Sequence, residues 1–159
     1  MNLVYNLLFI ILLVLIGFFV VSRVRIKLLK LWKEVSVKEV IFHKLLLETT
    51  KLIYNERLEL KNEENANLFR LISRYKKKKV RYLLLKERQD LFTALNYLIN
   101  DIEELEDEKY KSLLQKFKEL QKARRIYNSK VLVYNQAISV FPTRFLALKM
   151  NLKLKEYFG

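Results

Sequence analysis

Cysteine is absent from this chain of 159 residues, and glycine and proline are nearly absent. Without cysteine the chain has no disulfide framework, no thiolate ligand for a metal and no attachment site for a lipoprotein anchor. Hairpin sheets depend on glycine, Asn-Gly or proline at their turns, and this chain contains only Gly17, Gly159 and Pro142. We therefore expect an all-α fold.

Residues that perform catalysis are also scarce. His43 is the only histidine, and Glu39 and Glu48 do not give it the His-Glu-x-x-His spacing of a metal site. No glycine lies between residues 18 and 158, which excludes a glycine-rich phosphate loop. The acidic stretch 101–108 lacks the glycine that a calcium loop needs at its sharp turn. We expect no catalytic, cofactor-binding or metal-binding residues, and a protein that is not an enzyme.

Positive charge dominates the chain, and its distribution is uneven. The net charge is +14 at pH 7. Residues 22–33 contain five basic residues and no acid, and residues 70–88 contain nine basic residues against Glu87 alone. Residues 101–108 contain six acids and no base. A basic balance of this kind suits anionic lipid headgroups and nucleic acid equally well.

The long apolar run at residues 3–21 predicts a membrane-spanning helix. At ~1.5 Å per residue it is about 28 Å long, close to the ~30 Å hydrocarbon core. No basic residue precedes it, and Val20 to Arg23 offers no small-x-small cleavage pattern, so we expect an uncleaved anchor. Basic flanks stay in the cytoplasm, which predicts an outer N-terminus. We place the anchor and its basic juxtamembrane segment at 1–33, and a cytoplasmic helical bundle at 34–159.

The remainder predicts a bundle of long antiparallel helices. Ser36 and Glu39 have the spacing of a capping box, which would open a helix that runs to about Leu60. The polar stretch 61–65 should turn, and a second helix should begin near Ala66 and continue for eight turns or more. A turn must follow between residues 100 and 108, with either Asp101 and Glu104 or Asp107 as the cap.

The third helix has the most regular pattern of the chain. Its stripe positions are spaced alternately by three and four residues, which keeps one face toward a partner helix. The stripe consists of Tyr110, Leu113, Phe117, Leu120, Arg124, Tyr127, Val131, Tyr134, Ile138 and Phe141. Pro142 restricts the residue before it and should end the helix at Phe141. Such stripes are buried together in a helical bundle.

A Tyr-Asn dipeptide occurs twice in this helix, seven residues apart, before a Phe-Pro dipeptide. The signature residues are Tyr127, Asn128, Tyr134, Asn135, Phe141 and Pro142. With them, the stretch 123–158 resembles the LemA family of bacterial membrane proteins. The resemblance implies one N-terminal membrane helix and a helical-bundle domain, and thus an architecture rather than an activity. The family usually has Gly-Phe where Asn151-Leu152 stands; asparagine tolerates the left-handed backbone, so we expect the same turn.

Two roles are open for the Tyr-Asn pairs. In the structural role, which we favour, the tyrosine rings fill the core, and the asparagine amides bridge to a neighbouring helix or to tyrosine hydroxyls. In the other role the pairs form a polar strip that recognises a partner peptide. Neither residue type is a nucleophile or an acid at neutral pH without a base nearby.

The basic run at 74–82 has three interpretations. It is a solvated helix face, or it contacts anionic headgroups, where each basic residue contributes roughly 1 kcal/mol. Nucleic-acid binding, for which tyrosines interleaved with basic residues would be suited, is the least favoured. The residues concerned are Arg74, Lys76, Lys77, Lys78, Lys79 and Arg81.

Together these patterns favour a LemA-like, non-catalytic protein-interaction module of the bacterial inner membrane, with an unidentified protein partner and with membrane lipids around its anchor. One alternative is anionic-lipid or nucleic-acid binding through residues 70–88. Another is a structural coiled-coil protein of the cell envelope, which would place its coil outside the cytoplasm. A homo-oligomer stays open, because a tyrosine-rich stripe can close within one chain or between two.

Overall fold

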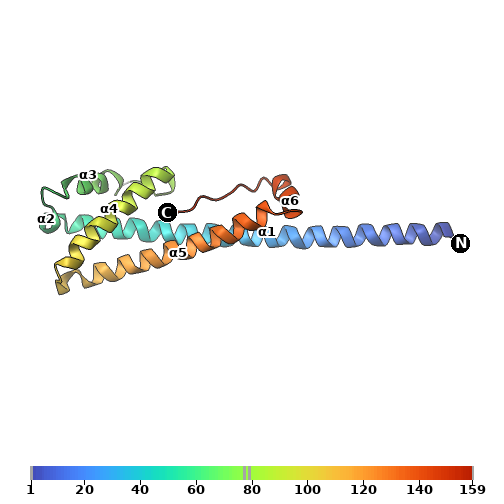
Figure 1. Cartoon of the computed structure of the whole chain (residues 1–159), viewed down its shortest axis with the longest axis horizontal. Helices are drawn as coiled ribbons and strands as arrows, with labels where there is room; N and C mark the ends of the chain where they lie inside the picture. Colours follow the sequence, from blue (N-terminus) through green and yellow to red (C-terminus); the bar gives the residue numbers. More distant parts are fainter. Residues whose placement is uncertain (1, 77, 79, 159) are drawn as a thin grey trace. The chain divides into compact units, whose positions relative to one another are not determined.

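The computed structural model describes residues 2–76, 78 and 80–158, and every regular element in these ranges is a helix (Figure 1). The predicted all-α class is therefore confirmed. In chain order the elements are α1 (Asn2–Asn55), α2 (Arg57–Leu60), α3 (Ala66–Tyr75), η1 (Val80–Tyr82), α4 (Leu85–Glu104), η2 (Glu108–Tyr110), α5 (Lys111–Ser139) and α6 (Thr143–Lys149). The C-terminal segment, Leu152–Phe158, contains neither helix nor strand.

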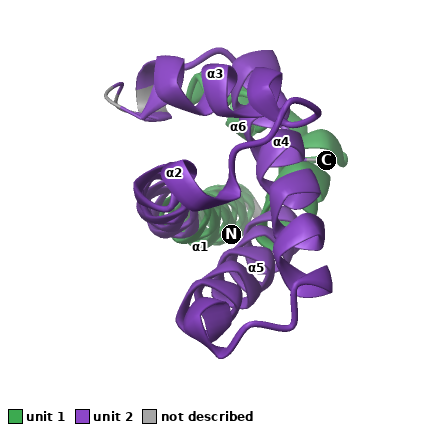
Figure 2. Ribbon diagram, turned by 90° about the vertical axis from the view of Figure 1, so that its left-hand side faces the viewer, with its two compact units in different colours: residues 1–35, 130–155 green, residues 36–129, 156–159 purple. Residues whose placement is uncertain are grey.

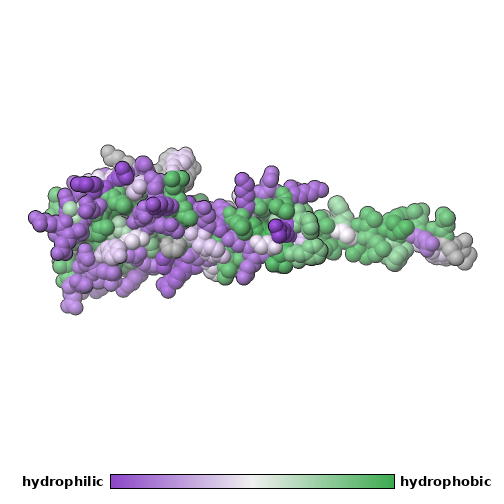
Figure 3. Space-filling view, turned by 45° about the horizontal axis from the view of Figure 1, so that its top comes forward, coloured by the Kyte–Doolittle hydropathy of each residue, from purple (hydrophilic) through white to green (hydrophobic). Residues whose placement is uncertain are grey.

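α1 is one helix of 54 residues. It is long and apolar enough to cross a membrane, and its most apolar stretch is not buried against any other part of the described chain. Figure 3 shows this stretch as an apolar surface at the N-terminal end. An exposed surface of this kind fits an N-terminal membrane anchor, since apolar side chains that leave water need lipid where they have no protein neighbour.

The helix start predicted at Ser36 is wrong. Ser36 lies inside α1, where the backbone N–H groups already bond within the helix, so a capping side chain has no free amide to accept from. Residues 33 and 34 also lie inside α1. The division into an anchor at 1–33 and a bundle at 34–159 stays a prediction, with no break in the helix at that point.

The predicted turn at residues 61–65 is present after α2. Asn62 and Asn65 hold it together, because each backbone N–H donates to the other side chain's Oδ1, at 2.9 Å and 2.8 Å. The Asn65 amide also donates to the Leu60 carbonyl at 2.9 Å. α3 then begins at Ala66, as expected.

The prediction of one long helix from Ala66 is wrong, because α3 ends at Tyr75 and α4 begins at Leu85. Lysines crowd the break, and like charges one turn apart destabilise a helix. Glu87 provides half of a capping box for α4, since its carboxylate accepts from the Leu84 N–H at 2.9 Å. The Tyr75 hydroxyl donates to the same carboxylate at 3.2 Å, and α3 packs against α4.

Asp107 is the cap between α4 and α5. Its Oδ1 accepts from the Lys109 N–H at 2.9 Å, and Glu106 before it has a φ of 48°. Asp101 and Glu104, the alternative cap, lie within α4. The turn contacts the end of α2, because Lys109 pairs with Glu59 and the Tyr110 hydroxyl donates to the same carboxylate at 3.2 Å.

By its contacts the chain divides into two compact units (Figure 2). Unit 1 comprises residues 1–35 and 130–155, and unit 2 comprises residues 36–129 and 156–159. The core of unit 1 includes Leu28, Val35, Val131, Tyr134, Ile138 and Ala147. The core of unit 2 includes Phe42, Leu46, Ile53, Phe69, Ile72, Leu91, Phe92, Leu95, Leu98, Ile102, Leu113, Phe117, Leu120, Tyr127 and Phe158.

The predicted stripe of α5 is largely buried. Of its apolar members only Phe141 is exposed, at 75%. α5 ends at Ser139, two residues before the predicted end. The Thr143 hydroxyl caps this end, because it lies 2.6 Å from the Ala137 carbonyl and 2.7 Å from the Val140 carbonyl. Pro142 therefore follows a helix end that a side chain already satisfies.

Candidate functional site

The first Tyr-Asn pair of α5 holds the main chain of the C-terminal segment within unit 2. The Asn128 side chain brackets Phe158: its Oδ1 accepts from the Phe158 N–H at 2.9 Å, and its Nδ2 donates to the Phe158 carbonyl at 2.7 Å. The Tyr127 hydroxyl donates to the Glu156 carbonyl at 2.9 Å. Three hydrogen bonds thus fix the backbone of the last described residues.

The second pair repeats this arrangement within unit 1. Asn135 brackets Lys155, with its Oδ1 2.9 Å from the Lys155 N and its Nδ2 2.8 Å from the Lys155 O. The Tyr134 hydroxyl donates to the Lys153 carbonyl at 2.9 Å. Both asparagine amides therefore bond to the main chain of the C-terminal segment, where a neighbouring helix or a tyrosine hydroxyl was expected.

The two pairs follow one register. A step of seven residues along α5, from Asn128 to Asn135, corresponds to a step of three residues in the opposite direction along the segment, from Phe158 to Lys155. Seven residues of α-helix rise ~10.5 Å, and three residues of extended chain advance about 10 Å. The heptad repeat of the helix thus matches the backbone of an extended segment, which explains why the dipeptide repeats as it does.

Burial keeps both tyrosines in their hydrogen-donating form. Tyr134 is fully buried, and burial raises the pKa of its phenol. Burial, with the negative charge of Glu39 as the next contribution, raises the pKa of Tyr127 to about 12. Near neutral pH each hydroxyl therefore remains protonated and donates to its carbonyl.

Phe158 anchors the segment in an aromatic cluster of unit 2. Its side chain is 1% exposed, and its ring lies 4.5 Å from the Phe42 ring and 5.5 Å from the Phe92 ring, both edge to face. The Phe42 ring stacks on Tyr127 at 6.0 Å. Arg124, the polar member of the α5 stripe, places its guanidinium 4.8 Å from the centre of the Phe92 ring.

The turn before the segment has the predicted backbone. Asn151 has a φ of 55°, in the left-handed region that asparagine and glycine tolerate. Its N–H donates to the Leu148 carbonyl, and the Leu152 N–H donates to the Ala147 carbonyl, both at 3.0 Å. This is a helix end of the left-handed type, and it turns the chain out of α6. The left-handed turn expected at Asn151 is therefore present.

Phe141 and Pro142, the remaining signature residues, lie at the α5–α6 connection and do not touch the segment through any contact described above. The exposed Phe141 ring lies edge to face with Phe145 at 5.9 Å. Pro142 immediately precedes α6. The structure thus groups Tyr127, Asn128 and their repeat around the segment, and leaves Phe-Pro at the connection.

The structure describes only part of the basic run. Lys77, Lys79 and the Arg81 side chain lie outside the described residues. The Lys76 amine lies 3.3 Å from the centre of the Tyr54 ring, and the Lys78 amine lies 5.4 Å from the centre of the Tyr75 ring. The exposed Arg74 lines a pocket between the α1–α2 end and α3.

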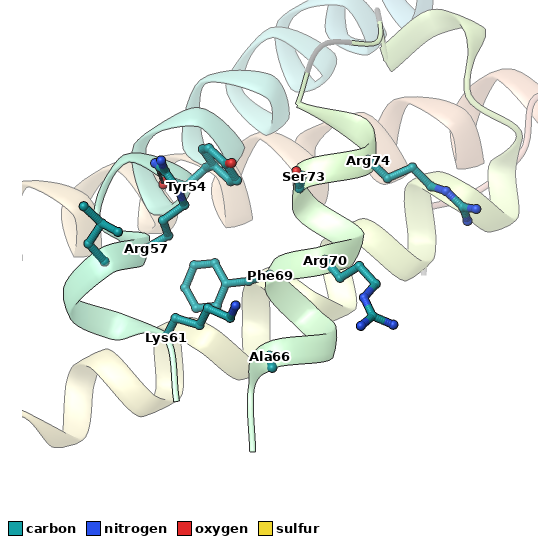
Figure 4. Close-up of a pocket in the computed structure, with 9 residues that line it drawn as sticks. Tyr54, Arg57, Lys61, Ala66, Phe69, Arg70, Ser73 and Arg74 are labelled. Atoms are coloured by element: carbon teal, nitrogen blue, oxygen red, sulfur yellow. Dashed lines mark hydrogen bonds between the residues drawn. The ribbon is translucent and has the colours of Figure 1, made fainter. Parts of the chain in front are cut away.

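This pocket has a volume of about 580 Å³, and no acidic residue is among those that line it. The lining residues are Tyr54, Arg57, Leu58, Lys61, Ala66, Phe69, Arg70, Ser73 and Arg74. Figure 4 shows the guanidinium groups of Arg70 and Arg74 extending from α3 away from the α1–α2 end. Hydrogen bonding by Lys76, and next by Ser73, lowers the pKa of the Tyr54 phenol.

A polar cluster at the α1–α4 contact has no counterpart among the predicted sites. Arg88 Nη1 lies 2.9 Å from His43 Nε2 and 3.9 Å from Glu39 Oε1. The ring of His43 also lies 5.8 Å from the Phe42 ring. Arg88 occupies one position in a series that is otherwise apolar, with Leu84, Leu91, Leu95 and Leu98, and this charge was the available signal for a polar partner.

Sequence patterns alone did not reveal the contact between the Phe158 and Phe42 rings, which anchors the C-terminal segment. Phe158 stands within the resemblance at 123–158, but the rings that its side chain contacts, Phe42 and Phe92, come from α1 and α4. The phenylalanine of this basic and apolar segment was the available signal, because an exposed phenylalanine is costly in water.

Comparison with known proteins supports the resemblance to the LemA family. Searches of curated proteins and of solved structures found no significant match. The model of the LemA family matches residues 56–159, which include the Tyr-Asn pairs, the left-handed turn and the C-terminal segment. This match extends over more than half of the chain, and the chain belongs to the LemA family.

Proposed function

We propose that this protein is a membrane-anchored, non-catalytic protein-interaction module. The supporting observation is the bracketing of the Phe158 main chain by Asn128, with Tyr127 bonded to the Glu156 carbonyl. Amide and phenol groups aimed at the backbone of an extended segment are a means of peptide recognition. The same groups offer no nucleophile or base, since the raised pKa of Tyr127 keeps its phenol protonated.

The module is tethered at the bacterial inner membrane, with the N-terminus outside and the helical domain in the cytoplasm. The apolar run 3–21 and the five basic residues that follow it, within 22–33, support this orientation. Protease added to intact cells should leave the domain undigested, and protease added to inverted membrane vesicles should degrade it. Degradation in intact cells would contradict the orientation and would favour a coil outside the cytoplasm.

Photocrosslinking in cells tests the interaction itself. A photoreactive residue at Leu154 or Tyr157 keeps the hydrogen bonds of the segment, because these side chains are exposed, at 64% and 44%. Tyr97, 59% exposed on α4, is the control position. We expect the same partner protein to be crosslinked from Leu154 and Tyr157, and not from Tyr97. Crosslinks only within the chain would contradict the interaction function.

An anion-binding function is the second candidate, and the pocket beside α3 favours it. Arg57, Lys61, Arg70 and Arg74 line this pocket, and Lys76 lies over Tyr54 at its side. The shared chemistry of its ligands is phosphate, whether in a lipid headgroup or in a nucleic acid. Attraction of this kind weakens with salt.

Vesicle and oligonucleotide binding by the full-length protein distinguishes these ligands. We expect neutralisation by Arg57→Gln with Lys76→Gln to weaken binding to vesicles that contain an anionic lipid. Neutralisation of the exposed α5 residues Lys118 and Lys122 to glutamine removes equal charge and should have less effect. Binding to single-stranded DNA with a steep salt dependence would indicate nucleic acid instead. Equal effects of the two neutralised pairs would contradict a defined pocket.

A further inference from the structure

The Tyr-Asn pair of unit 2 and the aromatic cluster beside it recognise little of the segment beyond its main chain. All three hydrogen bonds between this pair and the segment involve backbone atoms of Glu156 and Phe158. Glu156 and Tyr157 are exposed, and Phe158 alone is buried there. The site therefore requires an extended backbone with one phenylalanine, and it places little constraint on the other side chains.

The site is also costly to leave empty. Loss of the segment would expose the faces of Phe42 and Phe92 that Phe158 covers, and it would leave Asn128 and Tyr127 without these partners. Buried polar groups that lose a partner are destabilised. Replacement by another peptide with the same backbone and a phenylalanine restores every one of these contacts. Exchange of occupants is thus far more favourable than vacancy.

We propose that the site formed by Tyr127, Asn128, Phe42 and Phe92 is a peptide-binding site that the chain's own segment occupies, and that its partner is a protein with an extended peptide containing phenylalanine. This rests on the proposed interaction function and names the class of its partner. The partner's phenylalanine takes the place of Phe158, and its backbone takes the hydrogen bonds from Asn128 and Tyr127. The chain's own segment is the competitor that sets the threshold for binding.

The effective concentration of the tethered segment determines how strongly it competes with a free peptide. A segment tethered by a short connection is present at an effective concentration in the millimolar range. A free peptide at micromolar concentration therefore competes poorly with the intact segment. Weakening the segment's own anchor should reveal the affinity of the site, and Phe158→Ala does this because it removes the one side chain that is buried there.

Binding of a labelled peptide to the full-length protein in detergent micelles tests the proposal. The probe is a fluorescent peptide with the sequence of residues 152–158, Leu-Lys-Leu-Lys-Glu-Tyr-Phe. We expect it to bind the F158A protein at least about tenfold more tightly than the wild type, given the tethered competitor. A control peptide with alanine in place of its phenylalanine should not bind. Addition of Asn128→Ala to F158A should abolish binding of the first peptide.

A folded F158A protein, with its helical circular dichroism retained, that does not bind the peptide would overturn the proposal. So would equal binding of the phenylalanine and alanine peptides. The chain has no cysteine, so Tyr157→Cys provides a single site for a spin label in a protein that keeps Phe158. Excess phenylalanine peptide should increase the mobility of this label even if F158A does not fold. An unchanged label at millimolar peptide would also overturn the proposal.

These results are separable from the test of the interaction function. A partner crosslinked from Leu154 and Tyr157 together with failure of peptide exchange would keep the interaction module and reject exchange at this site. Successful peptide exchange without a crosslinked partner would support the site and count against the proposed function in the cells examined.

Discussion

Asn128 on α5 holds both backbone polar groups of Phe158, thirty residues further along the chain. One carboxamide supplies the acceptor for the Phe158 N–H at 2.9 Å and the donor for its carbonyl at 2.7 Å. An amide side chain has the same donor and acceptor geometry as a peptide group, so it pairs with a residue as a neighbouring strand would. The segment is thus held as if at the edge of a sheet, in a chain whose described residues contain no strand.

Asn128→Ala should destabilise the protein by about 1–3 kcal/mol, because it leaves the Phe158 N–H and carbonyl without their partner. Asn135→Ala should have a similar effect through Lys155, since its two bonds are equivalent. Gln136→Ala, at an exposed position next to Asn135, is the matched control and should change stability little. Thermal unfolding in micelles measures all three. A loss from Asn128→Ala no larger than that from the control would show that the brackets contribute nothing to stability.

Tyr127→Phe should lower the free energy of unfolding near neutral pH. It should also weaken the decline of this free energy at high pH. The variant loses the bond to the Glu156 carbonyl, worth about 0.5–1.5 kcal/mol. In the wild type the folded-state pKa is raised from 10.0 to about 12, so stability is fully present below pH 10 and declines as pH rises toward 12. The slope that Tyr127 contributes is at most ~1.4 kcal/mol per pH unit. Unfolding followed from pH 9 upward, at about half-unit steps, resolves this slope; parallel curves for the two proteins would refute the raised pKa.

Asn151 should tolerate glycine and resist alanine. At a φ of 55° a β-carbon is strained, and asparagine is among the few residues that adopt this conformation readily. Asn151→Ala should therefore cost about 1 kcal/mol, whereas Asn151→Gly should be close to neutral. The comparison of the two melting temperatures is the measurement. An alanine variant as stable as the glycine variant would show that the turn does not require the left-handed backbone.

Glu87→Gln should lower the melting temperature most at neutral pH. The N–H of Leu84 is the main cause that lowers the pKa of the Glu87 carboxyl below 4.5, and the Tyr75 hydroxyl adds to it. A lowered folded-state pKa gives stability that is present above pH 4.5 and is lost as pH falls through the folded value. The difference between wild type and variant should therefore shrink in acid. A difference that is constant with pH would contradict the assigned role of the carboxylate.

Elements with a repeated local pattern could be predicted from the sequence. The scarcity of glycine and proline predicted an all-α chain, and the spacing of the α5 stripe identified residues from Tyr110 to Ile138 as buried. Asn151 could also be predicted to turn, since its conformation depends on its own backbone. In each case the physical cause lies within a few residues of the pattern.

Features that depend on distant partners could not be predicted in this way. The box at Ser36 is sound locally, but the helix that begins upstream continues through it and satisfies its amides. The partner of the Tyr-Asn pairs was hidden for a different reason. Asn128 and Asn135 bond to backbone atoms, and every residue except proline has the same backbone groups, so the segment shows no side-chain pattern that marks it as their partner.

The asparagines of α5 bond to backbone atoms of the C-terminal segment. These bonds therefore constrain the number of residues in the segment more than the identity of its side chains. Most substitutions at Lys153, Leu154, Glu156 or Tyr157 leave the bonds to Asn135 and Asn128 intact, whereas proline at Lys155 or Phe158 would remove an N–H that donates to one of them. A single inserted or deleted residue between these two positions shifts one bracket out of register with the other. Apart from Phe158, the segment can therefore change widely by substitution during evolution, while the step from one bracketed residue to the other, Lys155 to Phe158, has to stay at three.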